Sequence, residues 1–196
     1  MDTEKIIDEL LENFGNFNIN DVPDIDLYMD QVTTLLNGKF DAFKRNDDDK
    51  LLTKTMINNY AKFKLLPPPE KKKYSKDHII VLIMIYFFKN VLSINDTGIL
   101  IGPAVEEFFH NEEHPLETMF DDFVSNIQQI NDKNEIKELY KKCSEAFDFS
   151  DFENKDYLQT LAYISILSYQ AYVRQQIIIK LIDNMNNCET TTDSPE

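Results

Sequence analysis

The sequence contains few glycines, few cysteines and no long apolar run. Only four of its 196 residues are glycine, and the turn-punctuated alternation of apolar and polar residues that is typical of β-sandwiches is missing. Its two cysteines, Cys143 and Cys188, are isolated and show no metal-ligand spacing. We therefore expect free thiols in a reducing cytoplasm and an all-α fold with no bound metal.

The most apolar run is IIVLIMIYFF, residues 79–88. It has ten residues, whereas a helix that spans a bilayer needs about 20, so we expect a buried central helix and no membrane contact. The first residues, MDTEKIIDELLENF, are acidic and amphipathic. A secretory signal would instead begin with basic residues and an apolar stretch, so a cytoplasmic protein is expected.

The sequence also lacks the common signatures of nucleotide binding and acyl transfer: no Gly-x-Gly-x-x-Gly, phosphate-binding loop or Gly-x-Ser-x-Gly is present. One pattern, HNEEH at residues 110–114, matches the His-x-x-Glu-His of a class of zinc peptidases. That pattern needs a continuous helix, and Pro115 disfavours helix at His114. We therefore predict a polar loop there, no enzyme activity and no cofactor, with a metallopeptidase as a remote alternative.

Apolar residues recur at helical spacing along almost the whole chain. The spacing predicts helices over residues 1–17, 26–43, 53–66, 76–91, 94–101, 104–109, 115–130, 134–147 and 155–185. Thr53 or Thr55 is expected to cap the third of these helices, and Ser75 is expected to cap the fourth with His78 at its third position. A small β-ribbon is also possible near residues 66–75.

Charge is distributed very unevenly. The chain has a net charge of −15, yet residues 50–76 contain eight lysines and one acid, a net charge of +7. Two helices joined by a loop, the second of them basic and followed by a lysine-rich turn, predict a helix-turn-helix with a wing. Such a unit binds duplex DNA, because a helix fits the major groove while flanking lysines contact phosphates.

The same region resembles a known type of regulator. Residues 56–68, MINNYAKFKLLPP, resemble the recognition helix and turn of MerR-type proteins, Thr-Leu-Arg-Tyr-Tyr-Glu-x-x-Gly-Leu-Leu-Pro-Pro. Residues 74–79 resemble their Tyr-Ser-x-x-Asp-Leu, and residues 93–96 resemble their Ser-Leu-x-Glu. More closely, residues 25–102 look like a bacterial family catalogued as domain of unknown function 1836. Its members are regarded as MerR-like helix-turn-helix proteins, some of them proposed repressors, so the resemblance implies a DNA-binding transcriptional regulator.

The expected DNA contacts lie on one face of helix 53–66 and in a short wing. Asn58, Asn59 and Lys64 stand where MerR proteins usually have Arg, Tyr and Gly, and asparagine suits bidentate contact with adenine. The full set of predicted contacts is Lys54, Thr55, Asn58, Asn59, Lys62, Lys64, Lys71, Lys72 and Lys73. The buried side of the helix is expected to hold Met56, Ile57, Tyr60 and Phe63. The alternative for each polar residue is an ordinary solvated surface.

The chain is expected to divide into an N-terminal helix and linker (1–21), a MerR-like helix-turn-helix (22–102), a C-terminal helical domain (103–187) and a disordered tail (188–196). The densely apolar last helix predicts either a domain core or a homodimer interface, and a homodimer is expected because operators are usually two-fold. An unknown effector is conceivable for the C-terminal half. An alternative function is a protein-interaction module on the same scaffold, which the acidic remainder of the chain favours.

Overall fold

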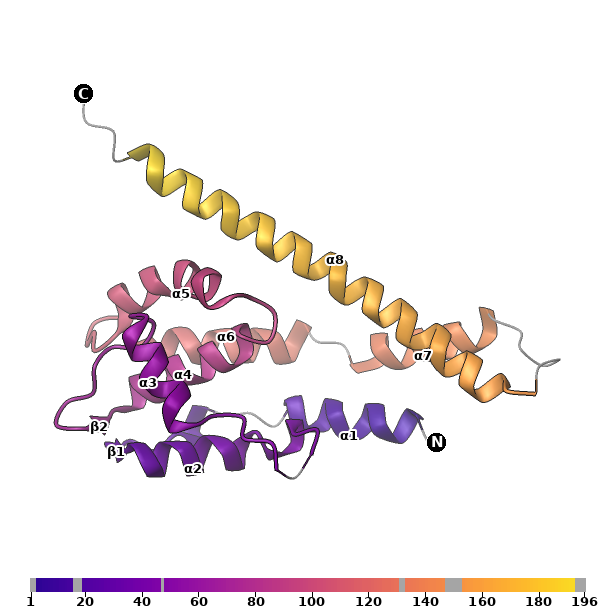
Figure 1. Cartoon of the computed structure of the whole chain (residues 1–196), viewed down its shortest axis with the longest axis horizontal. Helices are drawn as coiled ribbons and strands as arrows, with labels where there is room; N and C mark the ends of the chain where they lie inside the picture. The colour runs from indigo at the N-terminus through magenta and orange to yellow at the C-terminus, as the bar shows by residue number, and fades with distance from the viewer. Residues whose placement is uncertain (1–2, 16–18, 47, 131–132, 147–152, 193–196) are drawn as a thin grey trace.

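The computed structural model describes residues 3–15, 19–46, 48–130, 133–146 and 153–192. Most of these residues are helical, and the structure contains one two-stranded sheet (Figure 1). The helices are α1 (Thr3–Gly15), α2 (Met29–Lys39), α3 (Lys54–Lys62), α4 (Lys76–Phe88), α5 (Ile94–Phe108), α6 (Leu116–Ile130), α7 (Lys133–Ala146) and α8 (Lys155–Thr192). Short 3-10 turns are η1 (Ile19–Asp21) and η2 (Asp41–Phe43), and the strands are β1 (Leu27–Tyr28) and β2 (Lys73–Tyr74). The expectation of an all-α chain is confirmed.

Helix α4 lies at the centre of the larger hydrophobic core. Residues 79–83 are completely buried, and each such aliphatic side chain contributes about 1.5–3 kcal/mol through its removal from water. Ser75 precedes the helix, and its backbone N–H donates to His78 Nδ1 at 3.1 Å, which closes a capping box. The predicted central helix and its cap are both confirmed. The same core includes Leu36 of α2, Ile57 of α3, Ile101 of α5 and Phe120 of α6.

Strands β1 and β2 form an antiparallel pair, with Leu27 opposite Tyr74 and Tyr28 opposite Lys73. The predicted helix over 26–43 is therefore wrong at both ends, because it begins with a strand and finishes in η2. Pairing the strands buries Leu27 and Tyr74, and the N–H of Tyr28 donates to Gln31 Oε1 at 2.8 Å at the start of α2. Burial and capping together outweigh the helical pattern at these positions.

Helix α5 continues through Pro103 to Phe108, so the predicted break at Gly102–Pro103 is wrong. A proline inside a helix costs about 3 kcal/mol, because it removes one hydrogen bond and crowds the preceding turn. Ile101 is buried on one side of the proline, and Val105 packs against the core on the other. Burial on both sides offsets that cost.

Helix α8 forms the longest element and lies against α7 and α5 (Figure 1). Near its start a second, smaller core joins Ile7 and Leu11 of α1 to Cys143 of α7 and Tyr163 of α8. The helix runs to Thr192 rather than ending at residue 185, because an established helix gains one hydrogen bond for each residue added. Residues 188–192 of the predicted disordered tail are thus helical, and residues 193–196 lie outside the described residues.

Among the described helices, none combines the length and the apolar character that crossing a membrane requires.

Candidate nucleic-acid interface

Helix α3 has one apolar face in the core and one polar face in solvent. Thr53 caps it, since its side-chain oxygen accepts from the Met56 N–H at 3.2 Å. Ile57 and Tyr60 are buried. The polar face is exposed and consists of five residues at spacings of three and four, which are Lys54, Thr55, Asn58, Asn59 and Lys62. The structure therefore brings together the predicted contacts of this helix on one accessible surface.

Phe63 does not lie on the buried side, where the sequence pattern placed it. Its side chain is 65% exposed, because α3 ends at Lys62 and Phe63 occupies the cap position that follows. Phe63 comes four residues after Asn59 and therefore lies on the same side of the helix as the polar face. Its apolar ring stands at the C-terminal end of that face. The spacing of four between Asn59 and Phe63 is the sequence signal for this position. An exposed phenylalanine can contact the methyl group of thymine in the major groove.

The chain turns sharply at Lys64, which has a φ of 58°. The N–H groups of Leu65 and Leu66 both donate to the Tyr60 carbonyl, at 2.9 and 3.3 Å. The predicted helix 53–66 therefore extends four residues too far at its C-terminal end. Its last two leucines are buried, and the reversal at Lys64 is what directs them into the core. Positive φ is the conformation for which glycine is the usual choice.

Residues 70–74, here termed the wing, consist of a tight turn and strand β2. The Lys73 N–H donates to the Glu70 carbonyl at 2.8 Å, and Lys71 and Lys72 between them have φ values of 48° and 66°. Positive φ at both central residues defines a type I′ turn, in which Asn-Gly is the preferred pair. Lys71 and Lys72 are exposed, whereas Lys73 is partly buried. The turn thus presents two lysines at its tip.

The first turn of α2 lies between α3 and the wing. Asp30 of α2 forms an ion pair with Lys54 of α3. Tyr28, immediately before α2, has its ring 5.6 Å from Nζ of Lys73 in the wing. Lys54 and Lys73, 19 residues apart in the sequence, therefore flank the same short segment. Both members of the Asp30–Lys54 pair are exposed, so the pair is worth at most about 1 kcal/mol.

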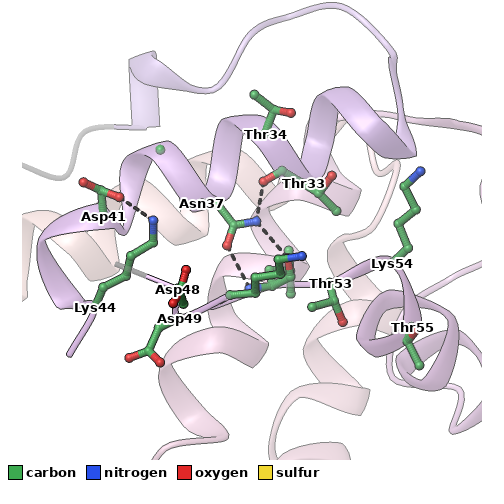
Figure 2. A pocket seen from close by; sticks show the side chains of 13 residues that line it. Thr33, Thr34, Asn37, Asp41, Lys44, Asp48, Asp49, Thr53, Lys54 and Thr55 are labelled. Carbon is green, nitrogen blue, oxygen red and sulfur yellow. Dashed lines mark hydrogen bonds and ion pairs between the residues drawn. The ribbon is translucent and has the colours of Figure 1, made fainter. Parts of the chain in front are cut away.

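A hollow of about 740 Å³ lies beside the start of α3, between α2 and the segment that leads into α3 (Figure 2). Its charged lining is balanced and consists of Lys44, Lys50, Lys54, Asp41, Asp48 and Asp49. Asn37 fixes the segment: its Nδ2 donates to the Leu52 carbonyl at 2.7 Å, and its Oδ1 accepts from the Leu52 N–H at 3.1 Å. The N-terminal end of α3 is consequently close to neutral, and the basic character concentrates at Lys62, Lys64 and the wing.

The His-x-x-Glu-His pattern lies between α5 and α6 and is not helical, so the geometry that a peptidase requires is not formed. His110 has a φ of 55°, and its Nε2 lies 3.0 Å from Oγ of Ser75. The backbone N–H of His110 donates to Asp77 Oδ2 at 2.7 Å. Over the described part of the chain, no three His, Cys, Asp or Glu residues are grouped to hold a metal. The pattern therefore does not form the helical zinc site on which the metallopeptidase alternative depends.

His78 occupies the core next to this loop. Its Nδ1 accepts from the backbone N–H of Ser75, and its Nε2 lies 3.4 Å from the Pro68 carbonyl. This arrangement fits a neutral ring with its proton on Nε2. Burial lowers the pKa of His78, because the charged ring would lose its hydration. His78 is thus a structural residue that joins the start of α4 to the proline turn after α3.

The fold defines a small helical domain with a basic helix, a short wing and an acidic helical remainder. Residues 17–123 match the family model described as Domain of unknown function (DUF1836), and the chain belongs to that family. The matched segment contains α2, α3, the wing, α4 and α5 and extends into α6. No curated protein and no solved structure gives a significant match.

Proposed function

We propose that this protein is a DNA-binding transcriptional regulator, acting as a repressor, in which α3 enters the major groove and the wing holds phosphate. The observation that carries the proposal is the position of three lysines. Lys64, Lys71 and Lys72 all have positive φ, where a residue other than glycine costs about 1–2 kcal/mol. Glycine or asparagine would relieve that cost, so lysine at all three positions indicates a role for the charge.

The order of elements supports a MerR-like helix-turn-helix with a wing. A strand precedes α2, the second strand follows the lysine turn, and the two pair with each other. The pairing places the turn beside the first turn of α2, which is ion-paired to α3. Helix α3 would therefore lie in the groove while Lys71 and Lys72 reach the adjacent backbone phosphates.

The acidic remainder of the chain limits binding to this one surface. Residues outside 50–76 carry a net charge of −22, and they repel DNA at any other face. Binding would depend on a few lysine–phosphate contacts and should weaken steeply as salt rises. We also propose that the regulator acts in the cytoplasm as a homodimer, since one such unit has little affinity or specificity by itself.

Genome-wide binding in cells that produce the full chain tests the proposal. We expect discrete binding sites that are lost in Lys62→Ala and Asn58→Ala, because these side chains point into solvent from the polar face of α3. Lys142→Ala is the matched control. Lys142 is an exposed lysine of α7, where it pairs with Glu138, so its loss should leave the binding sites unchanged. A wild-type chain without discrete sites would refute the proposal.

A second function, a protein-interaction module on the same scaffold, is favoured by the exposed Phe63 and by the Asp30–Lys54 pair, which neutralises one lysine of α3. The two functions differ in what Phe63→Ser should do. Loss of DNA sites would indicate that the ring contacts a base. Absent DNA sites in the wild type, together with a protein partner that is lost in Phe63→Ser, would favour the interaction module.

A further inference from the structure

Helix α8 contains an acid-free segment within a strongly acidic protein. Residues 157–182 include no Asp or Glu, although the whole chain has 35 of them, and the charged residues of this segment are Arg174 and Lys180. Two copies of a chain with a net charge of −15 repel each other across most of their surfaces. Along this segment the repulsion is absent, so it is the stretch on which a second copy could approach.

Most of the large exposed apolar residues of α8 lie in one row, which Ser165 interrupts. Residues four apart on a helix lie next to each other and make a ridge inclined by about 26° to the helix axis. In α8 one such row consists of Tyr157, Leu161, Ser165, Tyr169, Val173, Ile177, Leu181 and Met185. All of them except Val173 are exposed, and Val173 is partly buried. Within the described chain no other helix leaves so long an apolar row in solvent.

A groove runs beside this row. A hollow of about 360 Å³ is lined on one side by Val173, Ile177 and Leu181 of the row. On its other side lies the neighbouring row, which consists of Tyr172, Gln176, Lys180 and Asn184. Helix α8 thus carries a ridge and, beside it, a groove of the same inclination. A ridge of the same spacing on another helix would fit into this groove.

We propose that α8 is a homodimer interface in which the ridge of each copy packs into the groove of the other. Two helices that both use rows of residues four apart cross at about −50°. Such a pair is two-fold symmetric, and an isologous interface requires the self-complementary surface that α8 carries. The crossing lies near Val173, the middle of the row between Leu161 and Met185.

The available surface is large enough for such a dimer. A standard interface buries about 800 Å² on each partner, and a single aromatic side chain supplies about 150–250 Å². Tyr169 and Tyr172 are 69% and 59% exposed, and Ile177 and Leu181 are 55% and 58% exposed. Leu161 and Ile164 add further exposed apolar surface toward the start of the helix.

Sedimentation equilibrium of the full chain, without DNA, tests this inference. We expect a dimer at micromolar concentration, and we expect Ile177→Glu to raise its dissociation constant by about a hundredfold or more, because each dimer loses two central contacts and gains two buried charges. Circular dichroism checks that α8 stays helical. The matched control is Asn186→Glu, which adds the same charge at an exposed position outside the groove.

A crossed pair also brings each central residue close to its own copy. In a Cys188→Ser chain we expect Val173→Cys to form a disulfide-linked dimer on oxidation, and Asn186→Cys to remain unlinked. A monomeric wild type, a dimer unaffected by Ile177→Glu, or equal crosslinking at both positions would overturn the inference. A monomer that binds neutral lipid vesicles through α8 would replace the second copy with a membrane surface. None of these tests contains DNA, so they are independent of the DNA-binding proposal.

Discussion

The helices around α4 and the helices around α8 are both rich in aliphatic and aromatic residues, yet they bury them to very different extents. Ile79–Ile83 of α4 are completely enclosed, because α2, α3, α5 and α6 all contribute to the same core. Helix α8 lies against α7 and α5 and leaves many of its large apolar residues in solvent, including Tyr169, Ile177 and Leu181. Apolar content therefore predicts that a surface will be covered. It does not predict whether the same chain or a second one covers it.

The largest expected difference between the two regions is in the stability lost when one leucine in each is replaced by alanine. Leu82→Ala should destabilise the chain by about 2–5 kcal/mol, because Leu82 is fully buried and its loss leaves a cavity. Leu181→Ala should cost less than about 1 kcal/mol in dilute protein, since Leu181 is exposed there. Urea unfolding of both variants measures these free energies. Equal costs would mean that α8 is buried within the monomer.

A pH titration of stability probes the compact region alone. The pKa of His78 is lowered by burial, so the folded state favours the neutral ring and the unfolded state takes up the proton first. The stabilisation that comes from a neutral His78 should be fully present above about pH 6.5, the ordinary histidine pKa. It should be lost as the pH falls below that value. The total loss should be about 1.4 kcal/mol for each unit by which burial lowers the pKa. Thermal unfolding between pH 7.5 and pH 5 would show the decline.

The control for that titration is a pair of variants. His78→Gln should flatten the histidine-dependent part of the profile, although it lowers stability at every pH by disturbing the cap of α4. His114→Gln makes the same substitution at an exposed position and is the matched control. A wild-type profile that is flat across this range would contradict the assignment of a neutral, buried His78.

The lysines with positive φ allow a smaller test, in which the same substitution should act in opposite directions. Lys64→Gly should stabilise the chain by about 1 kcal/mol, because glycine adopts positive φ without a steric penalty. Lys62→Gly, at the end of α3, should destabilise it by up to about 1 kcal/mol, because glycine is a poor helix former. Chemical denaturation measures both effects, and DNA affinity should fall in both.

The smallest effect on stability is expected at the ion pair between α2 and α3. Asp30→Asn should change the free energy of unfolding by less than about 1 kcal/mol, because both side chains are exposed. It should nevertheless strengthen DNA binding, since Lys54 would no longer be neutralised. Fluorescence anisotropy at two salt concentrations separates these effects. Weaker binding by Asp30→Asn would show that Lys54 is held in place by its partner.

Local patterns predicted most of the fold. The ten-residue apolar run of α4, the Ser75 cap and the periodicity of α6 and α7 each arise from neighbouring residues, and these elements lie within two or three residues of the predicted limits. The polar face of α3 was also predictable, because helical spacing alone separates Asn58 and Lys62 from Ile57 and Tyr60.

The features that escaped prediction depend on contacts between distant residues. β1 forms because Leu27 and Tyr74 pair across 47 positions of the chain. Lys76 belongs to the basic segment, yet its ammonium group lies 2.6 Å from Asp24 and 2.7 Å from Glu117, on two other segments. The Lys76 charge is therefore neutralised by acids of the same chain. Neither helical spacing nor local composition reveals such partners.

The hydrogen bond between His110 and Ser75 has a mechanical consequence. Ser75 directly follows β2, three residues after Lys72 at the tip of the wing. His110 lies two residues after α5, the helix on which α8 rests. A displacement of α8 that pulls on α5 would therefore reach the base of the wing through a bond 3.0 Å long. The base of the wing is thus held to the end of the helix that α8 contacts.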